Sequence, residues 1–594
     1  MPELFDAMRP LPATAARYRE REWWRDRTFL DDLRDAAEQV PDRPALINWR
    51  TAEGRAVTLT FAELADRVER YAAGLDGLGV RPGEVVAFQL PDWWEAAALT
   101  LACWRVGAVT MPLSLRFGRR EVGRMLAATG AVLLVTTDRH PGPEHIEALA
   151  RLADDLPALR HRAVIGDASA AGALDFGSCL DTASRTAPRG TGLTPDEAAT
   201  VLFTSGTSGS ATAVVHSLNT LYAGVRRPLP IPPLLPGQPF PLLTPLSHGA
   251  GLRNGLLRPL VHRTTALYSD EWDAGRWLDL LGSYRAGALI APPAMLESLA
   301  TEQARRPRDL PAWEAVAAMA ASPSRELVDL LRRTLSDRVV NALGSTESGG
   351  ILSTALTDPP ERAARSVGRP MPGIELRMAP ATGADHASPV DLRGPSTCLG
   401  TFDRDTGRLL WRAADHDGWF PTGDLMRPDG EGGLRYAGRA SDRISGTTQL
   451  MIPVVDVETE LREHPAIDDV VLVGYPTEHG DLPCAVVVPA AGCSPGLAEL
   501  RTWLAGRGMT DWYWPTRVET VPRFPRNELG KVRKNVLRAW LSGAGPLSAD
   551  DDDPTTAAAP AAPAVPTTST ARAGSTTPTA SAPSAASARP PEDA

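Results

Sequence analysis

The chain has 594 residues, of which 43% are hydrophobic and 23% charged, and its net charge is −10. The length predicts at least two structural units and favours three or four, and the composition excludes a wholly disordered or collagen-like chain. Because the chain has no basic surplus, it is a poor candidate for a non-specific nucleic-acid binder, and we expect no nucleic-acid partner.

Signals for export, membrane insertion and metal binding are also missing. The first residues, MPELFDAMRP, contain no apolar signal core, and no run of about 18 apolar residues occurs in the sequence. Five scattered cysteines without a CxxC pair suggest neither a disulfide framework nor a zinc site. We therefore expect a cytoplasmic protein without a membrane span.

Helical and strand patterns alternate along most of the chain. Apolar residues at a spacing of three to four predict helices, and short apolar runs predict strands. In chain order, the predicted elements are a helix over 60–80, a strand over 84–90, a buried helix over 95–109, strands over 131–137, 469–475 and 485–490, and a helix over 498–508. This alternation favours parallel α/β sheets. Residues 549–594, rich in Ala, Pro, Thr and Ser, are predicted to be disordered because they cannot bury enough apolar surface.

A loop of Thr, Ser and Gly, TSGTSG, follows the apolar strand pattern at 201–203. Its glycines let backbone N–H groups approach a phosphate, and its hydroxyls add donors. It is not a Walker loop, because GxxxxGK[ST] is absent. By itself, such a run is also typical of a flexible surface turn.

Three later segments offer polar groups suited to nucleotide chemistry. In NALGSTESGG (341–350), Glu347 could hold Mg²⁺ and Thr346 could bind a phosphate oxygen. Asp424 lies in a TGD turn and could accept hydrogen bonds from ribose hydroxyls, and Arg439 of a GR pair could reach ribose or phosphate. Lys531, one of only two lysines, follows a glycine and could neutralise charge on a transferring phosphoryl group. Taken singly, each is also typical of a polar surface turn.

The order and spacing of these segments are far more specific than any one of them. The series TSGTSG, PLSHGAG, GSTE, TGD, GR and GK, between about residues 58 and 540, closely resembles the adenylate-forming superfamily: acyl-CoA synthetases, aryl-acid AMP ligases, peptide-synthetase adenylation domains and luciferases. The segment PRNELGKVRKNVLR is similar to the closing motif of acid–CoA ligases. The resemblance implies an α/β fold. A large N-terminal domain of stacked α/β sheets plus a small β-barrel (1–438) would be hinged to a small α/β C-terminal domain (439–548) ahead of the tail (549–594).

The resemblance also implies a role for each motif residue, with ATP and Mg²⁺ as cofactors. Asp424 would hold the ribose with help from Arg439, Thr346 would touch the α-phosphate, Glu347 would bind the Mg²⁺, and Lys531 would catalyse adenylation. The β- and γ-phosphates would be cradled by Thr204, Ser205, Gly206, Thr207, Ser208 and Gly209.

The PLSHGAG segment bears on the acyl substrate. The resemblance implies that His248 lines the acyl pocket near the adenylate. Arg253, five residues later, could pair with an anionic substrate group, but an Arg on a helix face that meets solvent is the commoner arrangement.

Several positions depart from the family pattern. The phosphate loop usually continues GxPKG but here reads GSATA, so Thr212 removes the lysine charge. The loop at 444–453, ISGTTQLMIP, lacks the usual RGGE, which puts CoA use in doubt more than adenylation. The hinge position holds Ser441, and the usual Gly-Gly-Ala reads Ala320-Ala321-Ser322, which would narrow the surface where adenine and substrate meet.

Three functions follow from the resemblance and its departures. The first is an ATP-dependent, AMP-forming ligase that joins a small aryl or medium acyl acid to a thiol of CoA or a carrier protein, in secondary metabolism. The second is an AMP-forming enzyme with a non-thiol second step, such as amide formation or nitrite-dependent diazotisation of an aromatic amine. The third, an inactive scaffold, is disfavoured because the chain keeps both of its lysines in the catalytic segment.

Overall fold

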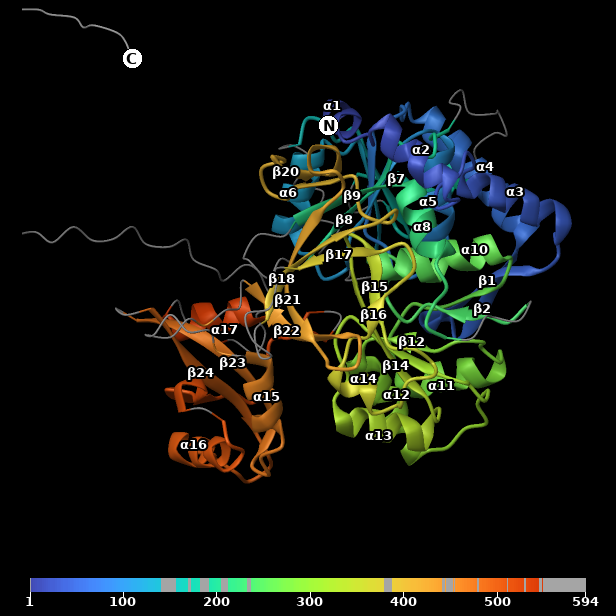
Figure 1. The fold of residues 1–594 in the computed structure, drawn as a ribbon. Coiled ribbons are helices and arrows are strands. Elements are labelled where there is room, and N and C mark those ends of the chain that lie inside the picture. The colour runs from blue at the N-terminus through green and yellow to red at the C-terminus, as the bar shows by residue number, and fades with distance from the viewer. Residues whose placement is uncertain are drawn as a thin grey trace, which may run out of the picture. The chain divides into compact units, whose positions relative to one another are not determined.

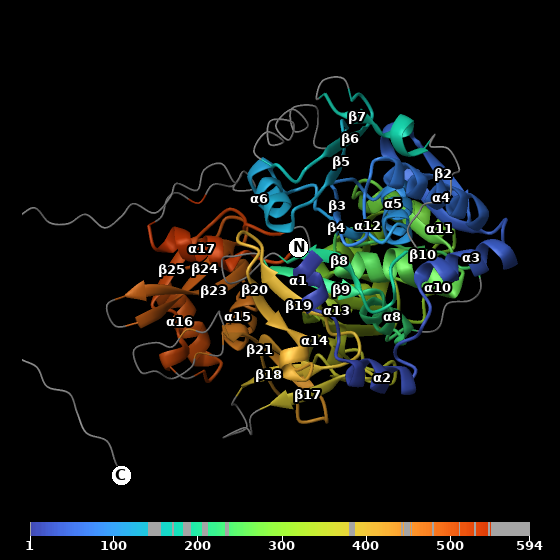
Figure 2. The same ribbon diagram turned by 90° about the horizontal axis from the view of Figure 1, so that it is seen from above.

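The computed structural model describes residues 2–139, 156–168, 172–181, 192–204, 212–231, 237–378, 387–440, 444, 452, 454–477, 480–509, 511–527, 530–543 and 547. The chain divides into two units, Met1–Asp553 and Pro554–Ala594, and all these residues lie in the first. The predicted boundaries at 438/439 and 548/549 stay predictions, and the predicted disorder of 549–594 concerns residues outside the described ranges. Figures 1 and 2 show the elements from two directions.

The largest sheet has nine strands and a parallel centre. The parallel strands are β8 (Ala198–Phe203), β4 (Val109–Pro112), β3 (Val85–Phe88), β5 (Leu133–Thr137), β6 (His161–Ile165) and β7 (Leu174–Asp175). Next to β8, the antiparallel strands β9 (Thr212–Ser217), β19 (Gly400–Asp403) and β20 (Leu409–Arg412) extend the sheet. Strands β8 and β9 pair antiparallel, and the TSGTSG segment lies between them in the sequence.

Both faces of this sheet are buried. On β3, Val86 and Phe88 belong to one core cluster, and Val85 and Ala87 belong to another. Helices cover the two faces, as Figure 2 shows, with α4 and α5 on one side and α6 on the other. Strand β3 is apolar throughout, because a parallel strand covered on both sides needs no polar face. The helices are α1 (Pro2–Ala7), α2 (Pro12–Glu20), α3 (Phe29–Gln39), α4 (Phe61–Gly77), α5 (Trp94–Arg105), α6 (Arg119–Thr129) and α8 (Leu218–Arg226).

A five-stranded sheet carries the second nucleotide motif. Its order is β12 (Ile290–Ala291), β13 (Val316–Met319), β14 (Val339–Ser345), β15 (Gly349–Ser353) and β16 (Arg369–Pro370), parallel up to β14 and antiparallel after it. It packs with the helices α11 (Ala274–Ser283), α12 (Pro293–Arg305), α13 (Arg325–Thr334) and α14 (Arg362–Arg365).

Two four-stranded sheets complete the part before residue 440. One consists of β10 (Phe240–Pro241), β11 (Ala266–Ser269), β1 (Pro44–Arg50) and β2 (Arg55–Thr60). The other is antiparallel and consists of β17 (Glu375–Met378), β18 (Ser388–Arg393), β21 (Phe420–Pro428) and β22 (Leu434–Arg439). This antiparallel sheet lies at the position in the chain where the small β-barrel is predicted.

Residues after 453 build their own small α/β layer, drawn in orange and red in Figure 1. Strand β23 (Ile467–Thr477) pairs antiparallel with β24 (Gly480–Pro489), which pairs parallel with β25 (Arg517–Thr520). One face packs on α15 (Val454–Arg462) and α16 (Leu497–Gly506), and the other packs on α17 (Lys534–Leu541). The predicted α/β fold class, with large and small parts, is confirmed.

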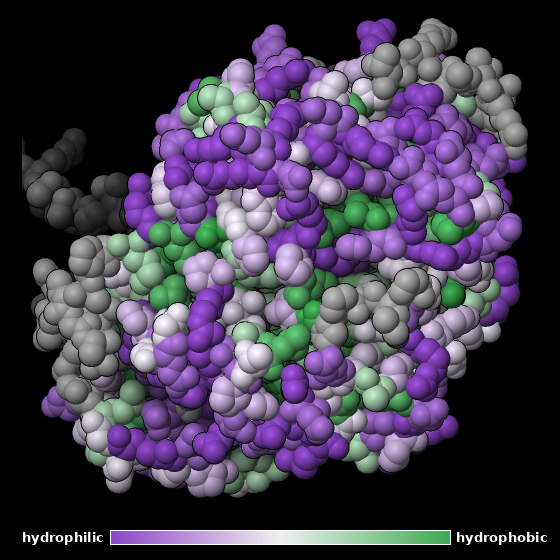
Figure 3. Space-filling model, turned by 45° about the vertical axis from the view of Figure 1, so that its right-hand side comes forward, coloured by the Kyte–Doolittle hydropathy of each residue, from purple (hydrophilic) through white to green (hydrophobic). Residues whose placement is uncertain are grey.

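The predicted elements exist, but their ends differ. The helix predicted over 60–80 is α4, which begins after Thr60, whose side chain accepts from Glu63 N–H. The helix predicted over 95–109 was too long: α5 ends at Arg105, Gly107 adopts φ +83°, and the chain enters β4 at Val109. No helix among the described residues is long and apolar enough to cross a membrane. Figure 3 shows a face that is mostly hydrophilic with smaller hydrophobic areas.

Candidate active site

The Ser-Thr-Glu motif forms the tight turn between β14 and β15. Thr346 and Glu347 are half-buried and follow the end of β14 at Ser345. The Cys398 N–H donates to the Glu347 carbonyl at 2.7 Å, and Ser396 Oγ donates to the Ser348 carbonyl at 2.7 Å. The turn is therefore held from the segment that leads into β19.

Asp424 and Arg439 face each other on neighbouring strands. They are register partners of β21 and β22, and Arg439 Nε lies 2.8 Å from Asp424 Oδ1. The Asp424 N–H donates to Thr422 Oγ1, which itself donates to the Val390 carbonyl. Desolvation lowers the pKa of Arg439, but Asp424, Tyr436 and Glu347 together outweigh it, so the pKa is raised. Arg439 is thus a charged donor beside the Asp424 carboxyl group.

Lys531 follows Gly530 in a turn that hydrogen bonds with Asn527 close. The Lys531 N–H donates to Asn527 Oδ1 at 2.9 Å, and the Asn527 N–H donates to the Lys531 carbonyl at 2.8 Å. The residue keeps exposed surface, but desolvation by surrounding protein atoms is the largest influence on its ammonium and lowers its pKa. Arg439 lowers the pKa further, while Asp424 and Glu347 oppose the shift. The structure therefore brings these four predicted residues into one electrostatic neighbourhood.

His248 immediately precedes a short helix that borders the same turn. It is half-buried and is the N-terminal cap residue of α9 (Gly249–Gly251), which continues into a π-helical turn, Leu252–Leu257, and α10 (Arg258–His262). A Cβ on Gly249 would lie 3.6 Å from Thr346 Cα. The residue after His248 thus lies close to Thr346, and the role of His248 in the acyl pocket stays a prediction.

The phosphate loop is only partly described. Thr204 follows β8, and its N–H donates to the Thr212 carbonyl at 2.9 Å. Thr212, in place of the family's lysine, begins β9 and pairs with Asp403 of β19. Ser205, Gly206, Thr207, Ser208 and Gly209 lie outside the described residues, as do Ser441 and most of the altered loop at 444–453.

The surroundings of Arg253 differ from those predicted. Arg253 is not on a solvent-facing helix surface: it is 4% exposed, and its Nη2 lies 2.9 Å from His216 Nε2 and 3.1 Å from the Thr346 carbonyl. Sequence reasoning missed His216 altogether, because a single His at the end of a buried strand carries no local signal of the residues it contacts.

Ala320 stands where the family has Gly. Its backbone keeps a left-handed φ of +71°.

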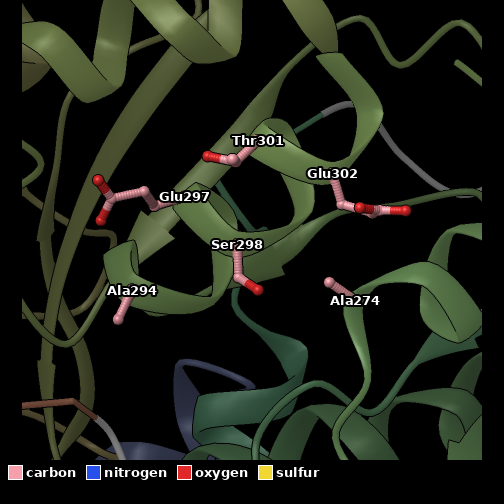
Figure 4. A pocket seen from close by; sticks show the side chains of 6 residues that line it. All are labelled: Ala274, Ala294, Glu297, Ser298, Thr301 and Glu302. Atoms are coloured by element: carbon pink, nitrogen blue, oxygen red, sulfur yellow. The ribbon is translucent and has the colours of Figure 1, made fainter. Parts of the chain in front are cut away.

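A pocket of about 500 Å³ lies along α12. It is lined by Ala274, Ala294, Glu297, Ser298, Thr301 and Glu302 (Figure 4). Figure 4 shows Glu297 and Glu302 directed to opposite sides, and Glu302 is paired with Arg305 and Arg308. Gly530 touches this helix, since a Cβ there would lie 2.8 Å from Ala294 Cβ. The pocket offers no charged group that is free to bind a ligand except Glu297, so we assign it no catalytic role.

Comparison with known proteins agrees with this geometry. Residues 33–386 match the family of AMP-binding enzymes, and residues 456–531 match the AMP-binding enzyme C-terminal domain. The chain is 30% identical over 567 residues to a salicyl-AMP ligase / salicyl-S-ArCP synthetase of Mycobacterium tuberculosis, covering 91% of this chain and 95% of that protein. It is 26% identical over 536 residues to the medium-chain fatty-acid–CoA ligase of Escherichia coli, covering 88% and 92%. A solved structure, the amide bond synthetase McbA from Marinactinospora thermotolerans, aligns with a TM-score of 0.72 at 25% identity, covering 86% of this chain and 100% of McbA.

Proposed function

Since the chain belongs to the AMP-binding enzyme family and is an AMP-forming ligase, we propose that it activates a small aryl or medium acyl acid with ATP and transfers it to a thiol. In the first half-reaction, a carboxylate oxygen attacks the α-phosphorus, and the bond to pyrophosphate breaks. In the second, a thiol sulfur attacks the acyl carbon, and AMP leaves with the bonding electrons. ATP and CoA are intracellular metabolites, so we place the reaction in the cytoplasm.

The observation that carries this proposal is the convergence of Lys531 with Asp424, Arg439 and Glu347. These residues come from four separate segments, and an inert fold would have no need to hold a partly desolvated ammonium beside two carboxylates and an arginine. Charge grows on the phosphoryl oxygens during adenylation, and a preorganised cation stabilises it.

Each motif residue has a task in the proposed reaction. Asp424 accepts hydrogen bonds from the ribose hydroxyls, and Arg439 holds that carboxylate in place through their 2.8 Å contact. Thr346 donates to the α-phosphate, Lys531 stabilises the charge that develops on it, and His248 forms the acyl-side wall. The loop from Thr204 to Gly209 receives the β- and γ-phosphates.

Mg²⁺ fits the site as a partner of the nucleotide. The described residues contain no cluster of three or more His, Cys, Asp or Glu side chains that could hold a metal by themselves. Mg²⁺ commonly uses one or two carboxylates together with substrate phosphates, and Glu347, next to Thr346, supplies one such carboxylate. When bound, the ion would neutralise phosphate charge.

The nature of the acid and of the acceptor rests on the relatives. The salicyl and medium-chain fatty-acid enzymes support an aryl or acyl acid, with the thiol of CoA or of a carrier protein as acceptor. A non-thiol acceptor is the second candidate, because the loop at 444–453 lacks the family's RGGE pattern and McbA, an amide bond synthetase, is similar over its whole length. An amine nitrogen would then take the place of the sulfur.

The test is pyrophosphate release from ATP and Mg²⁺ across a panel of aryl and aliphatic acids. Each acid is assayed alone, with CoA, with an amine, and with nitrite when the acid carries an aromatic amine. CoA-dependent turnover supports the thiol ligase, and turnover that needs an amine or nitrite instead supports the second candidate. If no acid supports pyrophosphate release and Lys531→Ala behaves like the unaltered protein, the scaffold hypothesis is supported.

A further inference from the structure

Three successive carbonyl groups of the turn, those of Thr346, Glu347 and Ser348, each meet a polar group from a distant segment. The carbonyls of Glu347 and Ser348 accept from Cys398 N–H and Ser396 Oγ. The Thr346 carbonyl lies 2.8 Å from His216 Nε2 and 3.1 Å from Arg253 Nη2. This third contact differs from the other two because it uses a buried cation and a buried imidazole.

Arg253 is a buried cation without a salt bridge among the described residues. Its hydrogen-bond partners there are His216 and the Thr346 carbonyl, and its Nε has none. Desolvation lowers the pKa of Arg253 to about 10 even though Glu347 attracts the guanidinium, so its burial costs free energy. Two other buried arginines of this region also place donors on backbone carbonyls: Arg258 on those of Arg227 and Gly224, and Arg227 on those of Pro372 and Gly350. Arg253 differs from both because its donor reaches the Thr346 carbonyl in the Ser-Thr-Glu turn.

The surrounding backbone leaves space for this side chain. A Cβ on Gly249 would lie 2.9 Å from Arg253 Nη1, and a Cβ on Gly349 would lie 3.5 Å from Arg253 Nε. Arg253 itself stands on the π-helical turn Leu252–Leu257, a distortion that is frequent at functional sites. The helix and the turn thus leave room for the guanidinium next to the Thr346 carbonyl.

His216 and Arg253 meet the Thr346 carbonyl together. Burial and the charge of Arg253 lower the pKa of His216 well below its usual value, so the ring is neutral and carries one proton. Thr220 Oγ1 lies 2.9 Å from His216 Nδ1 and 3.0 Å from the Ser217 carbonyl, and its one proton can go to either acceptor, so these contacts are compatible with both tautomers. With its proton on Nε2, the ring donates to the Thr346 carbonyl at 2.8 Å. With its proton on Nδ1, Arg253 Nη2 is the donor that Nε2 and the carbonyl share. In both tautomers, a buried donor holds the Thr346 carbonyl.

We propose that Arg253 and His216 are positioning residues for adenylation, which fix the peptide plane between Thr346 and Glu347. The Thr346 carbonyl belongs to that plane, and a peptide unit is rigid. Holding it therefore sets ψ of Thr346 and φ of Glu347, and with them the directions of both side chains. The proposal rests on the function proposed above, since these directions matter only if the two side chains meet ATP and Mg²⁺.

The experiment compares Arg253→Met with Arg258→Met. Arg258 is a matched control, because it lies five residues further on the same helical segment, is 5% exposed, and makes no contact with the turn among its described hydrogen bonds. We expect both variants to have similar midpoints in urea unfolding. Only Arg253→Met should lower kcat of acid-dependent ATP–pyrophosphate exchange, by about 100-fold, with the KM for the acid changed less than about 3-fold.

A binding measurement separates this proposal from the proposed function. Calorimetry with α,β-methylene-ATP, with and without Mg²⁺, should show that Mg²⁺ strengthens binding to the unaltered protein, and that this gain shrinks at least about 5-fold in Arg253→Met but not in Arg258→Met. If the unaltered protein shows no exchange with any acid, the proposed function fails, and the binding comparison still decides about Arg253. Equal behaviour of the two variants in both assays would overturn the positioning role.

His216 provides an independent test if Arg253→Met does not fold. His216→Gln can keep a polar group that donates or accepts near the position of Nε2, whereas His216→Leu cannot. We expect exchange in His216→Gln to stay within about 10-fold of the unaltered protein and that of His216→Leu to fall about 100-fold. Full activity in a folded His216→Leu variant would refute the proposal.

Discussion

The chain's only two lysines allow catalysis to be separated from folding. Lys531 keeps exposed surface, and its ammonium interacts with Asp424, Arg439 and Glu347. Lys534, three residues later, donates from Nζ to Glu458 Oε1 at 2.6 Å and to the Leu472 carbonyl at 3.3 Å. We therefore predict that Lys531→Ala abolishes adenylation in a stable protein, and that Lys534→Ala destabilises a protein that still adenylates.

The magnitudes follow from these surroundings. Loss of one preorganised group that stabilises transition-state charge costs about 3–4 kcal/mol, or about 100- to 1,000-fold in kcat. Because Lys531 is exposed, its removal should change the free energy of unfolding by less than about 0.5 kcal/mol. The Lys534 side chain is 18% exposed and Glu458 7%, and Glu458 Oε1 still accepts from Leu472 N–H, so the loss in Lys534→Ala should be about 2 kcal/mol.

Acid-dependent ATP–pyrophosphate exchange measures the first property, and urea unfolding measures the second. Exchange should fall only in Lys531→Ala, and the urea midpoint only in Lys534→Ala. The reasoning is refuted if Lys531→Ala retains more than about a tenth of the exchange rate, or if Lys534→Ala loses exchange while its urea midpoint is unchanged.

Four further outcomes are expected. Because the pKa of Lys531 is lowered, the alkaline limb of the pH profile of the exchange rate should have an apparent pKa below the usual lysine value of about 10.4. This apparent pKa should rise in Lys531→Arg, and an unchanged value would contradict the assignment. Asp429 is buried against Arg362, and hydrogen bonds outweigh burial to lower its pKa, so Asp429→Asn should cost about 3 kcal/mol of unfolding free energy at pH 7. A carboxylate with a depressed pKa stabilises the fold above its unfolded-state pKa and loses that effect as pH falls through the folded value, so this difference should shrink below about pH 4 in urea titrations. Ala320→Gly should stabilise the protein by about 1 kcal/mol in urea unfolding, since φ is +71°, and a loss of stability would argue against strain there. Thr212→Lys should lower the KM for pyrophosphate about 5-fold in exchange assays, as expected for about 1 kcal/mol from one added charge, while Thr212→Gln should leave it unchanged.

Local patterns predicted most of the fold but not its ends. The apolar run at 95–109 was interpreted as one helix, although α5 stops at Arg105 and β4 begins at Val109. Residues 96–104 of α5 and all four residues of β4 are buried, so the periodicity of the run could not divide the two elements. The better-defined amphipathic pattern at 60–80 gave a helix, α4, that ends within three residues of its prediction.

The family resemblance predicted candidate site residues from their motifs. These include Glu347, Asp424, Arg439 and Lys531, which the structure brings into one electrostatic neighbourhood. Arg253 was interpreted in the opposite sense, because its sequence position on a helix says nothing about which segment packs against it.

By itself, the sequence determined the order of α/β elements and the chemistry of the motifs, since backbone preference and side-chain type act over a few residues. Only the tertiary structure decided that Lys531 faces Asp424 while Lys534 holds Glu458, and that Arg253 and His216 share the carbonyl of Thr346. His216 and Thr346 are 130 residues apart in the chain. Contacts of this kind arise when sheets and helices pack to bury their apolar faces, and packing depends on the whole fold rather than on any local pattern.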